Sequence, residues 1–74
     1  MSATIRPFGM LQDYLQGAKE AQVASGQTVR QALTSLGIPP EVVALVLVND
    51  QPQDKEYLLQ EGDLVKILAV IGGG

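Results

Sequence analysis

The feature that most constrains the fold is a short segment that encodes both ends of an α-helix. Thr28 and Gln31 have the spacing of a capping box, in which each side chain accepts a hydrogen bond from the other residue's backbone amide. Gly37 suits the left-handed residue that ends a helix, and Pro39-Pro40 prevent continuation. Between these signals, apolar residues recur along one helix face, at Val29, Ala32, Leu33 and Leu36.

Segments rich in apolar and β-branched residues flank this helix and predict β-strands. We expect strands over residues 3–8, 19–24, 44–49 and 64–71, with a short helix over 9–17 after the first. The link from 50 to 63 is expected to be irregular, because it begins at an Asn49-Asp50 turn, contains Pro52 and ends at a turn containing Gly62. This order predicts a two-layer α+β domain in which one main helix packs on a mixed sheet.

Composition excludes several function classes. The chain has 74 residues without cysteine, histidine or tryptophan, so it lacks the usual neutral-pH base, a thiol nucleophile and the common zinc ligands. We therefore expect neither a self-contained enzyme nor a metal site. The net charge of −3 argues against a nucleic-acid partner.

The same sequence gives no sign of a secretory signal or a membrane span. Its longest apolar run, Val42 to Val48, is far shorter than the roughly 20 residues that cross a bilayer. We expect a soluble, cytoplasmic protein with no membrane partner.

Three glycines, Gly72, Gly73 and Gly74, follow the last predicted strand. A tail without Cβ atoms can thread a narrow channel, and three extended residues reach about 10 Å. Such a tail could present the Gly74 carboxylate inside a partner's active site. If a partner joins that carboxylate to AMP, sulfur or nitrogen can attack the acyl carbon. The alternative is a frayed terminus without a role.

Short motifs occur in order along nearly the whole chain: Phe8-Gly9-x-Leu11 followed by Gly17, Gly26-x-Thr28-Val29, Val48-Asn49-Asp50, Leu59-x-x-Gly62-Asp63-x-Val65 and Gly73-Gly74. In this order, the chain resembles the MoaD/ThiS sulfur carriers, which are relatives of ubiquitin with the β-grasp fold. The short helix after the first strand resembles the MoaD branch.

The resemblance implies a β-grasp domain of four to five strands over residues 1–71 and a flexible tail over 72–74. An adenylating enzyme similar to the ubiquitin activators would use ATP to activate Gly74, and a sulfur donor would convert it to a thiocarboxylate. The carrier itself would bind no cofactor. The acceptor would be the large subunit of molybdopterin synthase on the MoaD branch, where the carrier is the small subunit, or thiazole synthase on the ThiS branch.

Strand alternation gives a candidate partner-binding face beside the tail. If Val65, Ile67 and Ala69 face the helix, the neighbouring positions face outward. A register shift of one residue would invert this assignment. The predicted partner-binding residues are Leu47, Lys66, Leu68, Val70 and Ile71.

Two other functions fit the same sequence. The first is a ubiquitin-like modifier joined through Gly74 to lysines of target proteins, since nitrogen and sulfur attack the same adenylate. The second is a non-catalytic interaction module whose glycines are incidental.

Overall fold

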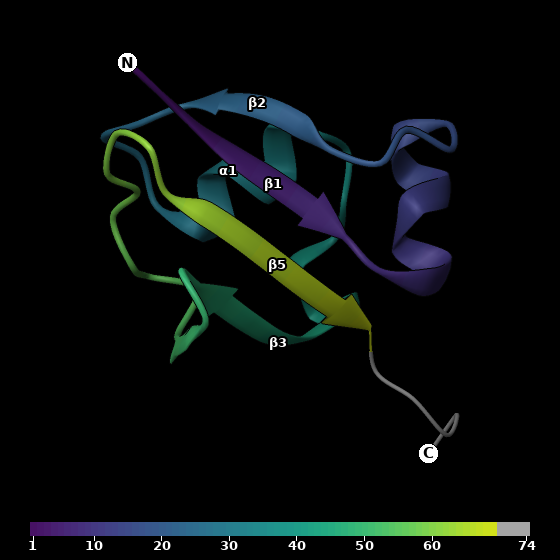
Figure 1. Ribbon diagram of the computed structural model, residues 1–74. Helices are drawn as coiled ribbons and strands as arrows, with labels where there is room; N and C mark the ends of the chain where they lie inside the picture. Colours follow the sequence, from purple (N-terminus) through teal and green to yellow (C-terminus); the bar gives the residue numbers. More distant parts are fainter. Residues whose placement is uncertain (70–74) are drawn as a thin grey trace.

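The computed structural model describes residues 1–69, which fold into a sheet with helices packed on one face (Figure 1). The elements in chain order are β1 (Ser2–Pro7), the 3-10 helix η1 (Gly9–Leu15), β2 (Ala21–Ala24), α1 (Val29–Ser35), the 3-10 helix η2 (Pro40–Val42), β3 (Val43–Val48), β4 (Gln51–Gln53) and β5 (Leu64–Ala69). The predicted strands and both predicted helices are therefore present. The last two residues of the strand predicted over 64–71 lie outside the described part.

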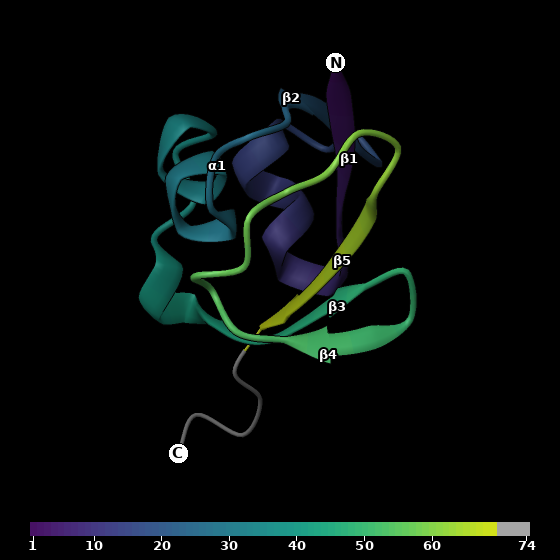
Figure 2. The ribbon, with the colours of Figure 1, turned by 90° about the vertical axis from the view of Figure 1, so that its left-hand side faces the viewer.

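The sheet is mixed, with strand order β2-β1-β5-β3-β4. β1 and β5 run parallel at its centre, and the other neighbours are antiparallel. Viewed from the side, α1 lies on one side of the sheet, and no helix within residues 1–69 covers the opposite face (Figure 2). This arrangement confirms the two-layer β-grasp architecture.

Both ends of α1 have the predicted chemistry. The Gln31 amide donates to Thr28 Oγ1 over 3.0 Å, and the Thr28 amide donates to Gln31 Oε1 over 2.9 Å. At the other end, Gly37 adopts a φ of 79°, and the Ile38 amide donates to the Leu33 carbonyl over 2.9 Å. The helix is therefore fixed at both ends by local interactions.

The prediction of an irregular link after residue 49 is wrong at its start. Asn49 and Asp50 have φ values of 51° and 70°, which form a tight turn of the kind that matches the twist of a hairpin. β4 then pairs with the end of β3 through Gln51, Pro52 and Gln53. Proline is accepted there because β4 is an edge strand, where one backbone side needs no partner.

The core lies between the sheet and α1. Inward side chains of β1, β3 and β5 meet the apolar stripe of α1, and Leu11 of η1 closes one end. The fully buried large side chains include Ile5, Leu11, Leu33, Ile38, Leu59, Val65 and Ile67.

Candidate functional site

The outward face of β3 and β5 is the surface that the sequence predicted for partner binding. Val65 and Ile67 are completely buried, and Val46 is almost so, which confirms the predicted strand register. Leu47, Lys66 and Leu68 alternate with them and are therefore directed to the opposite, uncovered face.

Strand pairing brings the predicted residues together. Lys66 pairs with Leu47 on one side and with Arg6 on the other, and Leu68 pairs with Leu45. Leu45 is 41% exposed, and the strand alternation that assigned Leu47 could have identified it from the sequence. We call this surface the leucine face, consisting of Leu45, Leu47, Leu64, Lys66 and Leu68.

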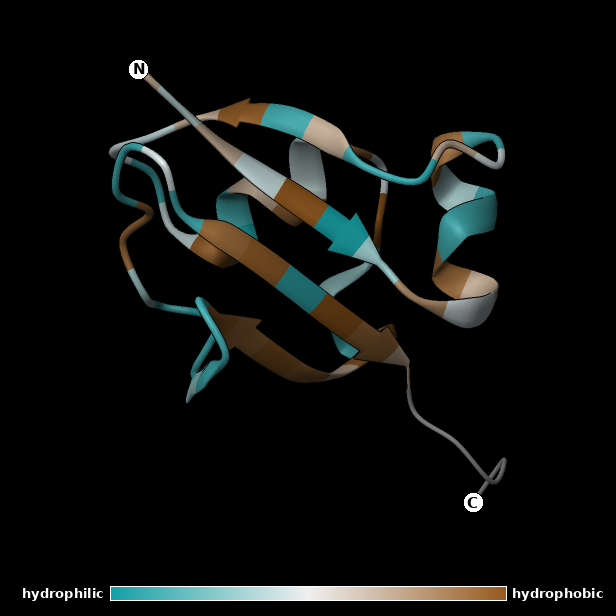
Figure 3. Cartoon of the chain, in the orientation of Figure 1, coloured by the Kyte–Doolittle hydropathy of each residue, from teal (hydrophilic) through white to brown (hydrophobic). Residues whose placement is uncertain are grey.

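The other half of the uncovered sheet face is polar, and its side chains bond to one another. Gln22 donates from Nε2 to Thr4 Oγ1 over 2.9 Å, and Ser2 donates to Gln22 Oε1 over 3.2 Å. In Figure 3, β3 and β5 are mainly brown, whereas β1 and β2 carry more teal. The apolar area available to a partner is therefore concentrated on β3 and β5.

Two cations sit side by side between these halves, and each has its own carboxylate at the margin. Arg6 Nη2 lies 3.4 Å from Glu20 Oε2, and Lys66 Nζ lies 3.1 Å from Asp50 Oδ1. Ion pairs as exposed as these contribute little to stability. Both cations can therefore exchange their carboxylates for those of a partner at low cost.

A hydrogen-bonded carboxylate fixes the start of β5. Asp63 is only 6% exposed, and it accepts hydrogen bonds from the Gln60 amide, Asn49 Nδ2 and the Tyr57 hydroxyl over 2.8–2.9 Å. Burial alone would raise the pKa of the Asp63 carboxyl, but these three donors outweigh it and lower the pKa. The hydrogen bond from the Tyr57 hydroxyl to the Asp63 carboxylate raises the pKa of Tyr57, because it stabilises the protonated hydroxyl.

Asn49 completes this link to the sheet. Its backbone amide donates to the Leu64 carbonyl over 2.8 Å, and the Leu64 amide donates to Asn49 Oδ1 over 2.9 Å. The network therefore ties the β3–β4 turn to the first residue of β5 and positions the leucine face. The sequence indicated turns at both places, but not their contact.

The remaining predicted site residues are Val70, Ile71, Gly72, Gly73 and Gly74, and they lie outside the described residues. β5 ends at Ala69, opposite Val43 of β3. The leucine face consequently adjoins the point at which the described chain ends.

Within residues 1–69, no group of three or more carboxylate, histidine or cysteine side chains is arranged to hold a metal ion. No described helix has the length and apolar composition that crossing a membrane requires.

A sequence model described as the ThiS family matches residues 5–74. The chain belongs to the ThiS family. This family consists of small ubiquitin-like carriers or modifiers rather than enzymes in their own right. A comparison with curated proteins gave no match.

Solved structures agree with this family. The chain is similar to small archaeal modifier protein 1 of Methanosarcina acetivorans, with 21% identity over 99% of this chain and 96% of the other, and a TM-score of 0.74. It is also similar to a putative molybdopterin converting factor subunit 1 of Pyrococcus furiosus, with 16% identity, 96% and 99% coverage and a TM-score of 0.72.

A third similar chain comes from the complex of subunits 1 and 2 of the Helicobacter pylori molybdopterin-converting factor. It is 20% identical, with complete coverage of both chains and a TM-score of 0.59. At these identities, the three likenesses show that the ThiS-family chain has the ubiquitin-like fold.

Proposed function

We propose that this ThiS-family chain is a sulfur carrier whose working group is the Gly74 carboxylate. The observation that supports this most is the match to the ThiS family over residues 5–74, which includes the terminal glycines. The leucine face supports it as well, because an uncovered apolar surface beside the end of β5 can hold a partner while that partner acts on Gly74.

The chemistry would be carried out by partners. An adenylating enzyme joins the Gly74 carboxylate to the α-phosphate of ATP, and pyrophosphate leaves. The terminal sulfur of a donor persulfide then attacks the acyl carbon and expels AMP. A second donor thiol cleaves the resulting S–S bond, which leaves a thiocarboxylate on Gly74 and a disulfide on the donor.

We propose molybdopterin synthesis as the destination of the sulfur, with thiamine thiazole synthesis as the alternative. Two similar structures bear the name of molybdopterin-converting factor subunits, and one of them was solved together with subunit 2. The predicted short helix after the first strand is present as η1, and it is the feature that favoured the MoaD branch. The acceptor would then be the large subunit of molybdopterin synthase.

A second candidate function is conjugation through Gly74 to lysines of target proteins. The similarity to a small archaeal modifier protein favours it. The same adenylate would serve, with a lysine amine as the nucleophile and an amide as the product.

An intact mass of the protein isolated gently from its native cells tests the sulfur-carrier function. A mass increase of one oxygen-to-sulfur exchange, localised to Gly74, is the expected result. Adducts with other proteins and no thiocarboxylate would favour the modifier function instead.

Deletion of Gly74 separates the tail from the fold. We expect activation by the adenylating enzyme to be lost, because the reacting carboxylate is displaced by one residue. The unfolding midpoint should stay unchanged, since the buried core residues that the structure describes run from Ala3 to Ile67. Retained activation would contradict the assignment of Gly74 as the working group.

A further inference from the structure

Within residues 1–69, the first half of β3 has a neighbouring strand on one side only. β4 pairs with Val46, Leu47 and Val48, and its last pair joins Gln53 to Val46. The preceding residues, 43–45, pair with β5 alone, through a register irregularity between Val43 and Leu45. This part of β3 is an open sheet edge.

The edge is open because the chain after β4 turns toward the helix layer. The Arg30 amide donates to the Lys55 carbonyl over 2.9 Å, and the Val29 amide donates to the Tyr57 carbonyl over 3.0 Å. These bonds satisfy the first amides of α1 and hold residues 55–57 away from β3. The backbone that could have extended β4 is thus committed elsewhere.

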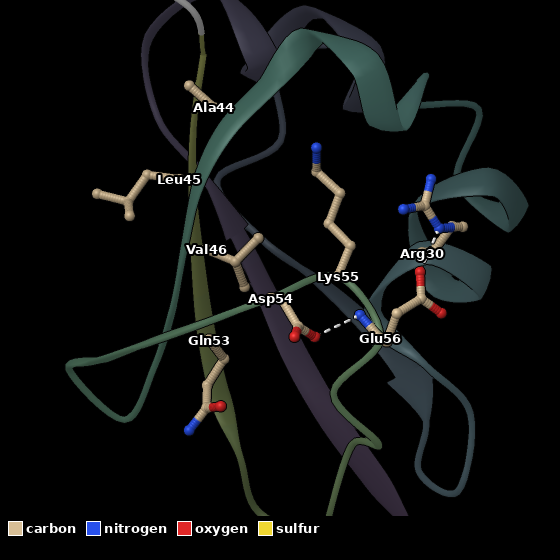
Figure 4. Close-up of a pocket in the computed structure, with 8 residues that line it drawn as sticks. All are labelled: Arg30, Ala44, Leu45, Val46, Gln53, Asp54, Lys55 and Glu56. Atoms are coloured by element: carbon tan, nitrogen blue, oxygen red, sulfur yellow. Dashed lines mark hydrogen bonds and ion pairs between the residues drawn. The ribbon is translucent and has the colours of Figure 1, made fainter.

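A hollow of about 400 Å³ occupies the space between this edge and α1 (Figure 4). Ala44, Leu45 and Val46 line it from β3; Ala44 and Leu45 are exposed, whereas Val46 is buried. The opposite wall consists of Arg30 of α1, Gln53 at the end of β4, and Asp54, Lys55 and Glu56 of the chain that follows. The hollow therefore combines an open strand edge, an apolar side and a charged side.

Most charged side chains around the hollow already have an ion-pair or hydrogen-bond partner. Arg30 Nε lies 2.7 Å from Glu56 Oε2, and Asp54 Oδ1 accepts a hydrogen bond from the Glu56 amide over 2.8 Å. The Lys55 ammonium forms no ion pair or side-chain hydrogen bond with any residue in 1–69. In Figure 4 its side chain extends into the space between β3 and Arg30.

We propose that this open half of β3 binds an extended segment of a partner protein in which apolar and acidic side chains alternate. The segment adds as a strand beside residues 43–45, so its backbone replaces the pairing that β4 does not provide. An apolar side chain packs on Ala44 and Leu45, and a carboxylate meets Lys55. Leu45 belongs to the leucine face as well, so a partner already on that face can reach this edge without a gap.

The binding surface is built from residues 1–69 alone, and its test is independent of carrier chemistry. The probe is a blocked five-residue peptide that alternates valine and aspartate, titrated into the 15N-labelled full chain. We expect the amide signals of Ala44 and Leu45 to shift on binding. In the Lys55→Glu variant, the affinity for the acidic peptide should fall by at least about two- to fivefold. The reason is that the attraction between residue 55 and a peptide carboxylate becomes a repulsion.

Two controls make the result specific. Lys19→Glu carries the same charge change on an exposed residue outside the hollow, and it should bind the peptide like the unmodified chain. A peptide that alternates valine and lysine should bind more weakly than the acidic peptide. The proposal is overturned if the acidic peptide shifts no signals up to about 5 mM. It is also overturned if Ala44 and Leu45 do not respond, or if both lysine variants bind equally.

Discussion

Asp63 shows how one side chain can hold together segments that are separate in the sequence. Its carboxylate collects hydrogen bonds from the link before it, from Tyr57 and from the β3–β4 turn. A buried carboxylate without such donors would be strongly unfavourable. With them, the ionised form is preferred, and the start of β5 has one well-defined position.

This preference predicts a pH dependence of stability. The pKa of Asp63 is lower in the folded chain than its ordinary value of 3.8, so ionised Asp63 stabilises the folded state above that pH. The stabilisation is lost as the pH falls through the folded pKa. We expect the free energy of unfolding to decline below about pH 4, and Asp63→Asn to remove part of that decline.

Urea unfolding of both proteins between about pH 2 and pH 7 measures this difference. At neutral pH, Asp63→Asn should lower the free energy of unfolding by about 1–3 kcal/mol, because the amide cannot accept all three hydrogen bonds. An unchanged pH profile in the variant would contradict the role given to the carboxylate.

Local signals could not have revealed these contacts. Gly62-Asp63 and Asn49-Asp50 each indicate a turn, because Asn and Asp side chains bond to nearby backbone and glycine accepts a positive φ. The bond from Asn49 to Asp63 joins residues 14 positions apart and depends on how β3 lies beside β5. Such a partner is set by the tertiary structure rather than by the sequence next to it.

At the scale of elements, prediction succeeded where the determinants are local. α1 was predicted with its cap, its apolar stripe and its final glycine, because all of these lie within ten residues of sequence. β4 was missed because the end of β3 is its one neighbouring strand in the part of the chain that the structure describes. A short strand containing proline is recognisable only once its edge position is known.

The buried stripe of α1 can be tested through Leu33, which is completely buried and faces the sheet. Leu33→Ala should lower the free energy of unfolding by about 2–5 kcal/mol, because it leaves a cavity between the two layers. Denaturant unfolding is the measurement. As a comparison, Arg30→Ala on the exposed side of α1 should cost much less, and similar losses in the two variants would contradict the assigned helix face.

At the scale of the molecule, the sheet has one covered and one uncovered face, and only half of the uncovered face is apolar. Strand alternation in the sequence predicted three residues of the leucine face, namely Leu47, Lys66 and Leu68. It did not predict the polar half, where Ser2, Thr4 and Gln22 bond to one another. That division depends on which strands are neighbours, and strand order follows from the whole fold.

The leucine face can be tested by a change that leaves the core intact. Leu47→Asp should weaken binding of the adenylating or acceptor partner by at least about tenfold, because a charge would be buried in an apolar contact. Surface plasmon resonance with the purified partner measures the change. Leu58→Asp is the matched control, since Leu58 is 53% exposed but lies outside β3 and β5. Equal losses in both variants would rule out a specific contact through this face.

The position of β5 has a consequence for how the chain is made. β5 is the last described strand to be synthesised, yet it lies at the centre of the sheet, between β1 and β3. The ribosome produces the N-terminal strands first. Until residues 64–69 emerge, β1 and β3 lack the strand that lies between them in the finished sheet. Nascent chains that stop early therefore cannot complete the sheet and are exposed to proteases. The cell would then hold folded copies only of chains whose translation has passed through β5, the strand that leads to the terminal glycines.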